Sequence, residues 1–280
     1  MFTKWINRII TAFLVPILMS PTSPVFLLKK AANQPKELYS ISDSAVIEEK
    51  MHITAHRGVN AEAPENTLPA YQKAVEYGYY SAECDIKLTS DNVWVLAHNN
   101  NLGSKFWQQG LVAKTDFETL RTYTYCSGAN FWTFPDLKIP TLDEFLDVFV
   151  GCETRPQIEI KTSNYDMLHT VIDAVRAKGL ASQAIIISFD LKQLRILREY
   201  DKDIELWYLC YMITQKKIDE AKSLGNCWLS ADYATNTVKT ISKALDQNVG
   251  VSVWTVDTIK DAEKMYKLGM RYIETDRLRP

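Results

Sequence analysis

The stretch from Ala184 to Cys210 reads AIIISFDLKQLRILREYDKDIELWYLC and shows the unit from which the chain is built. It begins with an apolar run at 184–189, continues with a helical pattern at 191–199 and ends with a second apolar run at 204–210. Near-continuous apolar runs of this length are typical of strands that are buried on both faces of a parallel sheet. A strand, a helix and a second strand in this order predict one parallel βαβ unit.

The same alternation extends over most of the chain. The other strand candidates are 52–56, 80–86, 93–98, 157–161, 227–230, 250–256 and 271–275, and the other helical patterns are 67–77, 141–149, 165–178, 214–224, 235–247 and 258–268. About eight such units in succession predict an α/β fold, the TIM (β/α)8 barrel. The nine strand candidates exceed the eight of a barrel, so one of them is false or peripheral.

Two segments depart from the alternation. The linker KLTSDN between the strands at 80–86 and 93–98 is too short for a helix, so these two strands are expected to form a hairpin. Residues 100–140 contain no clear strand and are rich in aromatic residues. We expect this segment to be a small insertion after the third strand, with its aromatic residues forming either a small core or a surface for a lipid or headgroup.

Composition excludes several classes of protein. The 280 residues include 32 Lys and Arg against 34 Asp and Glu, a net charge of −2. Such a balance provides no basic field for nucleic acid, so no nucleic-acid partner is expected. The five cysteines are scattered and none forms a C-x-x-C pair, which disfavours a disulfide scaffold and a zinc site.

The N-terminus differs from the rest of the chain. Residues 9–28 carry no formal charge, and the apolar run at 9–19 has the length of the hydrophobic region of a signal peptide. The whole stretch is also long enough to span a bilayer, although its three prolines would interrupt a helix. We therefore expect residues 1–30 to be a signal peptide or a membrane anchor, residues 31–50 a linker and residues 51–280 the folded domain, exported or membrane-anchored.

Polar residues at the carboxyl ends of the predicted strands suggest where a site lies. Buried parallel strands are normally apolar, yet several of these strands end in ionisable or amphipathic side chains, namely His56, Arg57, Glu83, Asp85, His98, Glu159, Lys161 and Trp254. The carboxyl ends of barrel strands meet at one rim, where the catalytic sites of this architecture lie. Burying so many ionisable groups without a task would cost too much stability, so we expect a shared functional pocket.

The charged side chains of this set suit a metal ion and a phosphate. Glu83, Asp85 and Glu159 offer hard oxygen ligands, which favour one divalent cation, Ca²⁺ or Mg²⁺, over zinc. Arg57 offers a planar fork and Lys161 a point charge, and both are good partners for a phosphate oxygen.

The two histidines complete the chemistry. His56 and His98 titrate near neutrality and can supply an acid and a base. A divalent cation, two cationic side chains and two histidines together predict phosphoryl transfer on a phosphodiester.

The motifs of the chain resemble those of a known family. The stretch AHRGVNAEAPENTLPAYQKAVEYG at 55–78 resembles the opening of the glycerophosphodiester phosphodiesterases. The motifs AECDIKLTSDNVWVLAHN, IPTLDEFLD, IEIK, ISFD, VSVWTVD and IETDR follow in the order that this family shows. The resemblance covers residues 52–280, which is essentially the whole folded part.

The resemblance implies a fold, a reaction and a role for each site residue. It implies a TIM barrel with a small insertion and the hydrolysis of a small glycerophosphodiester to sn-glycerol 3-phosphate and an alcohol. The family's metal ligands correspond to Glu83, Asp85 and Glu159, its acid and base to His56 and His98, its phosphate contacts to Arg57 and Lys161, and Trp254 would line the glycerol side.

One departure and two alternatives accompany this interpretation. The family usually has Asp after the second histidine, whereas this chain has Asn99, which could orient His98 or touch the substrate. One alternative is a sphingomyelinase D-like phospholipase on the same barrel, and the other is an inactive, membrane-tethered binding protein. The sequence leaves open the alcohol, the choice between Ca²⁺ and Mg²⁺, the order of the two histidines and the oligomeric state.

Overall fold

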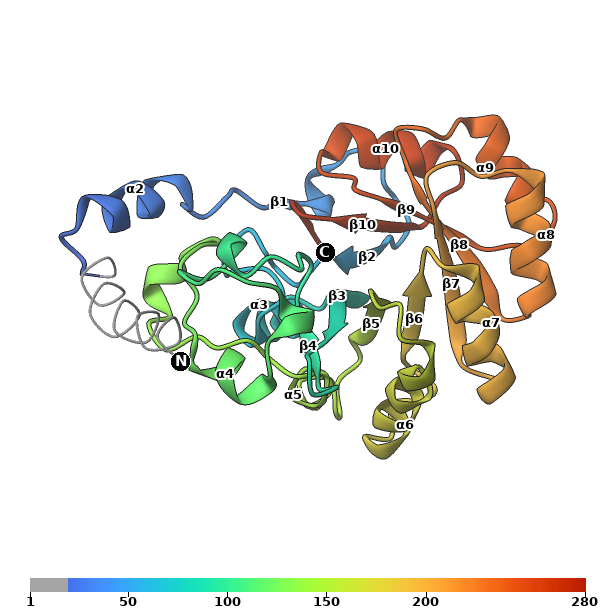
Figure 1. The fold of residues 1–280 in the computed structure, drawn as a ribbon. Coiled ribbons are helices and arrows are strands. Elements are labelled where there is room, and N and C mark those ends of the chain that lie inside the picture. The colour runs from blue at the N-terminus through green and yellow to red at the C-terminus, as the bar shows by residue number, and fades with distance from the viewer. Residues whose placement is uncertain (1–19) are drawn as a thin grey trace.

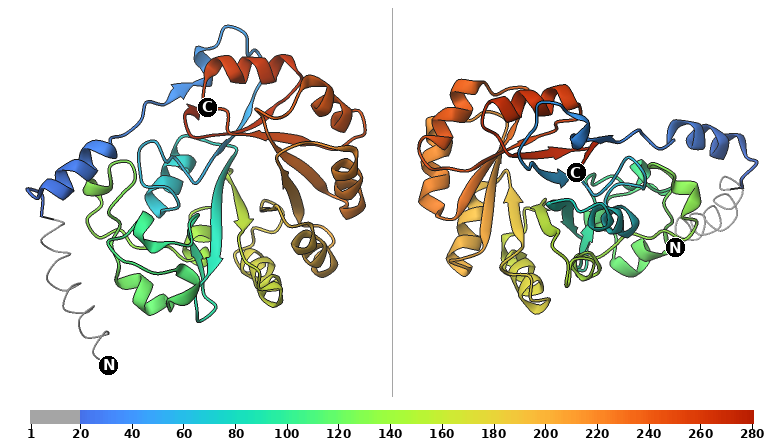
Figure 2. Two further views of the ribbon diagram at one scale, coloured as in Figure 1. Left: turned by 45° about the horizontal axis from the view of Figure 1, so that its top comes forward. Right: turned by 180° about the vertical axis from the view of Figure 1, so that it is seen from behind.

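The computed structural model describes residues 20–280, and the predicted hydrophobic run at residues 9–19 lies outside the described residues. Eight parallel strands close into a barrel in the order β2, β3, β5, β6, β7, β8, β9 and β10, and β2 pairs with both β3 and β10 (Figures 1 and 2). Helices cover the outside of the barrel between successive strands. The predicted TIM barrel is therefore confirmed.

The strands of the described chain are β1 (Tyr39–Ser40), β2 (His52–Ala55), β3 (Ser81–Leu88), β4 (Trp94–Leu96), β5 (Arg155–Ile160), β6 (Ile185–Ser188), β7 (Glu205–Cys210), β8 (Cys227–Asp232), β9 (Val251–Trp254), β10 (Tyr272–Thr275) and β11 (Leu278–Arg279). Its α-helices are α2 (Pro24–Ala32), α3 (Leu68–Glu76), α4 (Phe117–Thr122), α5 (Leu142–Asp147), α6 (His169–Ala177), α7 (Leu191–Tyr200), α8 (Gln215–Leu224), α9 (Val238–Leu245) and α10 (Ile259–Lys267). Each predicted strand is present, and each predicted helical pattern coincides with one of these helices to within a few residues at either end.

The ninth predicted strand is peripheral to the barrel. Strand β3 is twice as long as β2, which pairs only with its first residues, at Ser81 and Ala82. The last residues of β3, 86–88, pair with β4 in antiparallel fashion. The predicted hairpin is thus confirmed, and β4 occupies the edge of β3 that β2 leaves uncovered.

Two apolar layers position the rim. Between barrel and helices lies one large cluster of buried side chains, which includes Cys84 on the outer face of β3. Inside the barrel a smaller cluster centres on Trp207 and is joined by Trp228, whose ring stacks on it at 5.4 Å between centroids. All five cysteines are free thiols.

The insertion between β4 and α5 has a core of its own. Phe106 and Tyr125 pack edge to face at 4.8 Å between ring centroids, within a buried cluster that also contains Leu102 and Leu120. Of the two predictions for its aromatic residues, the small core is therefore confirmed for Phe106 and Tyr125.

The segment that precedes the barrel makes ordered contacts. Helix α2 lies against the insertion, where Phe26 meets Phe131, and β1 pairs with β11 near the C-terminus (Figure 1). None of the helices within residues 20–280 has the length and apolar character needed to cross a membrane. The division into an N-terminal segment, a linker and a domain that begins at residue 51 stays a prediction.

Candidate active site

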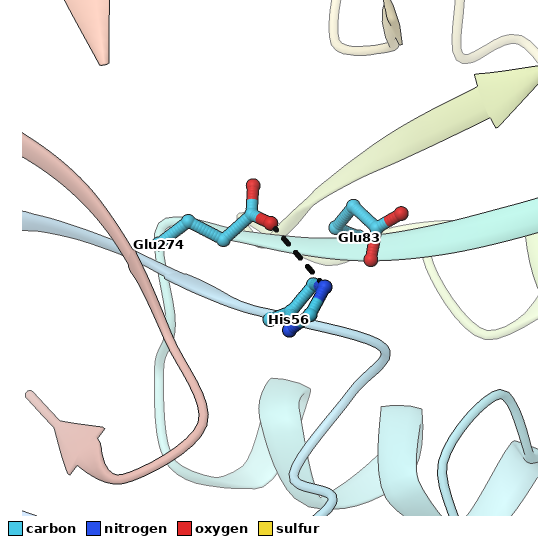
Figure 3. A group of neighbouring side chains, drawn as sticks. All are labelled: His56, Glu83 and Glu274. Atoms are coloured by element: carbon cyan, nitrogen blue, oxygen red, sulfur yellow. Dashed lines mark ion pairs between the residues drawn. The ribbon is translucent and has the colours of Figure 1, made fainter. Parts of the chain in front are cut away.

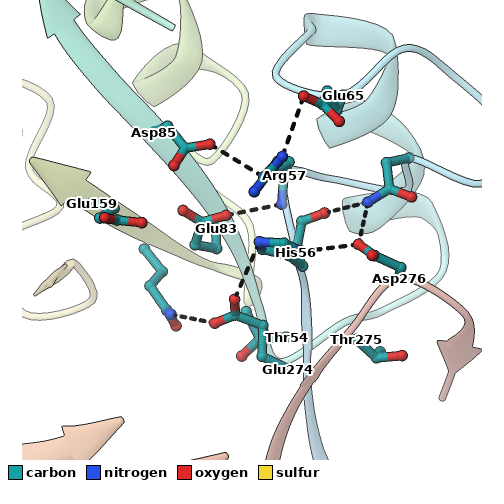
Figure 4. Close-up of polar contacts among 12 residues, drawn as sticks. Thr54, His56, Arg57, Glu65, Glu83, Asp85, Glu159, Glu274, Thr275 and Asp276 are labelled. Carbon is teal, nitrogen blue, oxygen red and sulfur yellow. Dashed lines mark hydrogen bonds and ion pairs between the residues drawn. The ribbon is translucent and has the colours of Figure 1, made fainter. Parts of the chain in front are cut away.

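Ionisable side chains gather where β2, β3, β5 and β10 end. Figure 4 shows the side chains of His56, Arg57, Glu83, Asp85, Glu159 and Glu274 close together inside the rim. Hydrogen bonds and ion pairs join the site residues in two groups, one around His56 and one around Asp85, which meet at the adjacent residues His56 and Arg57. The sequence placed His56, Arg57, Glu83, Asp85, Glu159 and Lys161 there, and the structure brings all six together.

Three of these side chains form a compact carboxylate group. Glu83 and Asp85 are two residues apart on β3, so both point into the barrel, and Glu159 is in register with Asp85 on β5. One oxygen of each carboxylate lies within 4.8 Å of one oxygen of each of the other two. Glu83 Oε1 is buried and accepts no hydrogen bond from any described residue. Converging hard oxygens, one of them unpartnered, fit a divalent cation.

The environment separates the acidities of these carboxylates. Burial raises the pKa of Glu83, and the neighbouring charge of Asp85 raises it further. Burial and Asp85 also raise the pKa of Glu159, to about 7. Burial alone would raise the pKa of Asp85, but Lys161 and Arg57 hold it well below its ordinary value. Asp85 is therefore the carboxyl group of the three that loses its proton most readily.

Arg57 is held in a tight turn directly after β2. Its φ of 59° is left-handed, and its backbone N–H donates to Glu83 Oε2 at 2.9 Å. Its guanidinium lies 3.3 Å from Asp85 Oδ2 and donates to Glu65 at 3.3 Å. The next residue, Gly58, has a φ of 75°, and a Cβ there would lie 2.7 Å from the Cβ of Ala70. Only glycine fits this close approach of the turn to α3.

Lys161 occupies the opposite side of the carboxylate group. Its ammonium lies 3.0 Å from Asp85 Oδ1 and 3.1 Å from Glu159 Oε1. Asp85 therefore has a guanidinium at one oxygen and an ammonium at the other. Both cations lie at the open end of the barrel, partly exposed, where a phosphate could reach them.

His56 is fixed by acidic partners at both ring nitrogens. Its Nδ1 is 2.9 Å from Asp276 Oδ1, and its Nε2 is 3.8 Å from Glu274 Oε1. Figure 3 shows Glu274 and Glu83 beside each other, with the ring of His56 below both carboxylates. Burial by itself would lower the pKa of His56, but the hydrogen bond to Asp276 and the charges of Glu274 and Glu83 raise it to about 10. Asn60 donates to Asp276 and to the His56 carbonyl, which locks the pair.

His98 approaches the same site from the hairpin. The N–H of the preceding residue, Ala97, donates to the carbonyl of Asp85 at 2.9 Å, which brings the end of β4 to the rim. His98 Nδ1 lies 3.1 Å from Asn99 Oδ1, so the residue that departs from the family pattern contacts the histidine. Burial lowers the pKa of His98, and the charges of Arg57 and Lys161 lower it further. The negative charge of Asp85 has the opposite effect and raises it, but the net shift is downward.

The other half of the rim is aromatic. Trp254 ends β9 and packs edge-on against Phe189 and Tyr211, at 6.0 and 5.7 Å between ring centroids. Phe189 and Tyr211 follow β6 and β7 and are exposed, Tyr211 by 63%. We call these three residues the aromatic wall. Trp254 thus belongs to this wall and makes none of the ionic contacts of the network around Asp85.

Three further polar residues belong to the site, of which the sequence did not identify Glu274 and Asp276. Asn66 donates to Asp85 Oδ2 at 2.8 Å and accepts from its backbone N–H at 3.0 Å, so it orients this carboxylate. The sequence could not separate that role from capping of the next helix. Glu274 is a carboxylate in the middle of an apolar strand, the same signal that identified Glu83. Asp276 follows the end of its strand as His56 does, which was also a usable signal.

The chain is similar to several known proteins. The model of the glycerophosphoryl diester phosphodiesterase family matches residues 56–279. Glycerophosphodiester phosphodiesterase 1 of Mus musculus is 37% identical over 277 residues, covering 80% of this chain and 78% of that protein. The glycerophosphodiester phosphodiesterase of Caldanaerobacter subterraneus is 27% identical over 237 residues, covering 81% and 94%.

A solved structure shares the fold. A phosphodiesterase of Oleispira antarctica, in complex with the product sn-glycerol-3-phosphate, superposes with a TM-score of 0.71 at 22% identity and covers 85% of this chain and 96% of that one. The family match extends over nearly the whole barrel and begins at His56 itself. The chain therefore belongs to the glycerophosphoryl diester phosphodiesterase family.

Proposed function

We propose that this protein hydrolyses glycerophosphodiesters to sn-glycerol 3-phosphate and an alcohol, with a divalent cation at the carboxylate group. The observation that carries the proposal is the convergence of Glu83, Asp85 and Glu159 with Arg57 and Lys161 at the rim of a barrel of this family. An inactive binding protein would have no use for this set together with two histidines.

The phosphate is expected to lie between the two cationic side chains. Arg57 and Lys161 flank Asp85, so a phosphodiester above that carboxylate would meet a guanidinium fork and an ammonium. Glu83, Asp85 and Glu159 would hold Ca²⁺ or Mg²⁺, which when bound supplies further charge to stabilise the phosphoryl oxygens. Glu65 keeps Arg57 aligned, since it accepts a hydrogen bond from the guanidinium.

The two histidines have opposite surroundings, which supports opposite roles. His56 has a carboxylate near each ring nitrogen, an arrangement that favours the imidazolium and suits a proton donor to the leaving alkoxide. His98 Nδ1 lies against the neutral amide of Asn99. Burial and the positive charges of Arg57 and Lys161 lower the pKa of His98 and favour the neutral imidazole, although the charge of Asp85 opposes them. We assign His98 as the base that takes the proton of the nucleophile.

The aromatic wall suits the carbon face of the glycerol. Trp254 and its two aromatic neighbours lie at the rim of the same barrel end as the ionic residues, so a substrate whose phosphate meets Arg57 and Lys161 would direct one substituent toward them. Apolar rings contact the C–H face of a small polyol and leave its hydroxyl groups to the solvent. The complex of the Oleispira antarctica enzyme with sn-glycerol-3-phosphate supports this product for the fold.

The test is product identification with the full chain and glycerophosphocholine, followed by phosphorus NMR. We expect sn-glycerol 3-phosphate and choline, loss of the product in His56→Ala and full activity in His169→Ala, an exposed histidine on α6. Phosphocholine as the product would contradict the proposed bond cleavage. Hydrolysis of sphingomyelin in place of glycerophosphocholine would support the lipid-cleaving alternative.

A further inference from the structure

Helix α2 has its charged residues on the inside and its apolar residues on the outside. Phe26 is its one buried residue and meets Phe131 of the insertion at 5.7 Å between ring centroids. Lys29 lies 4.2 Å from the ring of Trp107 and Lys30 5.2 Å from the ring of Trp132, both in the insertion. A surface helix of a water-soluble protein normally shows the reverse pattern.

The outward face of α2 carries no polar side chain. Its residues are Pro24, Val25, Leu27, Leu28, Ala31 and Ala32, and all six are exposed. Leu28 is 71% exposed and Leu27 51%. Single exposed leucines are ordinary, but six apolar residues that share one helix face and leave no polar side chain there indicate a surface that another apolar phase covers.

The helix is fastened to the protein, so this face is a fixed surface. The Gly128 N–H donates to Asn33 Oδ1 at 2.7 Å, and the Asn130 N–H donates to the carbonyl of Asn33 at 3.0 Å. The ammonium of Lys29 donates to Cys126 Sγ at 3.0 Å. These bonds come from the same insertion that receives Phe26.

The flanking sequence indicates what covers the face. The uncharged run Ile9 to Met19 precedes α2 closely in the chain. Residues 1–36 contain five Lys and Arg and no Asp or Glu. A short apolar helix face with excess positive charge and adjacent tryptophans has the composition of segments that lie in the interface of an anionic bilayer.

We infer that the outer face of α2 lies in the headgroup region of a lipid bilayer and holds the insertion side of the barrel against the membrane. The active site adjoins this side, because Lys105 of the insertion pairs with Glu65 at 3.1 Å and Glu65 pairs with Arg57. The barrel mouth is then fixed beside the membrane surface. This inference is independent of the reaction that the site performs.

The test measures the depth of α2 in vesicles made of equal parts phosphatidylcholine and phosphatidylglycerol. The full chain carries Cys152→Ser, which removes the one cysteine that is not buried, and a fluorophore at Leu28→Cys. The matched control carries the fluorophore at Val150→Cys, an equally apolar position that is 52% exposed and lies in the turn after α5. Hydrolysis of glycerophosphocholine by each labelled protein checks that it is folded.

The quenching of each label shows whether lipid, water or protein covers this face of α2. We expect nitroxide-labelled lipid to quench the label at residue 28 several-fold more strongly than the label at residue 150, and aqueous acrylamide to show the reverse order. Equal access of acrylamide to both labels would mean that α2 lies in water and would overturn the inference. Protection of residue 28 from both quenchers would mean that protein covers it, either residues 9–19 or a second copy, and would overturn it as well.

Discussion

At the scale of the residue, Gly58 illustrates how a backbone requirement positions a contact of the candidate site, the hydrogen bond from the Arg57 N–H to Glu83. We expect Gly58→Ala to lower the free energy of unfolding by about 2–4 kcal/mol. The new Cβ would clash with Ala70, and residue 58 would have to keep a left-handed backbone conformation that alanine disfavours. The same shift would pull the Arg57 N–H from Glu83, so activity should fall as well. Urea unfolding and an assay with glycerophosphocholine measure both effects.

Gly179→Ala is the matched control for this substitution. Gly179 has a φ of 72°, but nothing lies within 4 Å of an added Cβ. Gly179→Ala should therefore lower the free energy of unfolding only by the cost of a left-handed alanine, about 1–2 kcal/mol. Its activity should be unchanged. Equal losses of stability in the two variants would show that the contact with Ala70 does not matter.

Also at this scale, the roles of the two histidines can be distinguished with substrates that differ in their leaving group. A p-nitrophenolate leaves without a proton, whereas a choline alkoxide needs one. We expect His56→Ala to lose about 10²–10⁴-fold in kcat with glycerophosphocholine and far less with the p-nitrophenyl ester of glycerol 3-phosphate. His98→Ala should lose the same factor with both substrates. If the p-nitrophenyl ester rescues His98→Ala instead, the two roles are exchanged.

At the scale of the element, Asp201 joins α6, α7 and β7 away from the site. Its Oδ1 accepts from the N–H groups of Asp203 and Ile204, each at 2.8 Å, and its Oδ2 accepts from Arg176 at 2.6 Å. Burial alone would raise the pKa of Asp201, but these donors lower it. Because the folded pKa lies below the unfolded value of about 3.9, the carboxylate stabilises the fold above that pH and loses this effect as the pH falls through the folded pKa.

Asp201→Asn should therefore lower the free energy of unfolding by about 1–3 kcal/mol at neutral pH. Below about pH 4 the free energies of unfolding of the variant and the unsubstituted protein should approach each other. Urea unfolding at several pH values measures it. Asp203→Asn, at an exposed position in the same loop, should leave stability nearly unchanged. A difference for Asp201→Asn that stays constant down to pH 3 would contradict the role of the charge.

The elements of the barrel were predictable because its strands are short apolar runs and its helices have apolar residues at helical spacing. The hairpin of β3 and β4 was also predictable, since six residues cannot form a crossover helix. The contacts of His56 with Glu274 and Asp276 were not, because they arise only when β10 closes the barrel against β2, more than 200 residues later. The seating of α2 on the insertion was equally hidden, because that irregular segment has no period to interpret.

At the scale of the whole molecule, the barrel rim is divided by chemistry. Strands β2, β3, β5 and β10 contribute the ionic network, and β6, β7 and β9 lead into the aromatic wall. The division places charge where a phosphate would bind and apolar rings where carbon would lie. The carboxyl ends of the barrel strands meet at one rim although the strands are far apart in the sequence. The residues of the site are therefore distributed over most of the folded chain.

We propose that the carboxylates, the cationic side chains and His56 form one metal-dependent phosphodiesterase centre. The most direct test is the release of sn-glycerol 3-phosphate from glycerophosphocholine as a function of free Ca²⁺ or Mg²⁺ after treatment with EDTA. We predict no release without the cation, recovery with one of the two ions, and a midpoint about tenfold or more higher in Glu159→Gln. Release that persists in EDTA, or a Glu159→Gln curve identical to that of the unsubstituted protein, would contradict the claim.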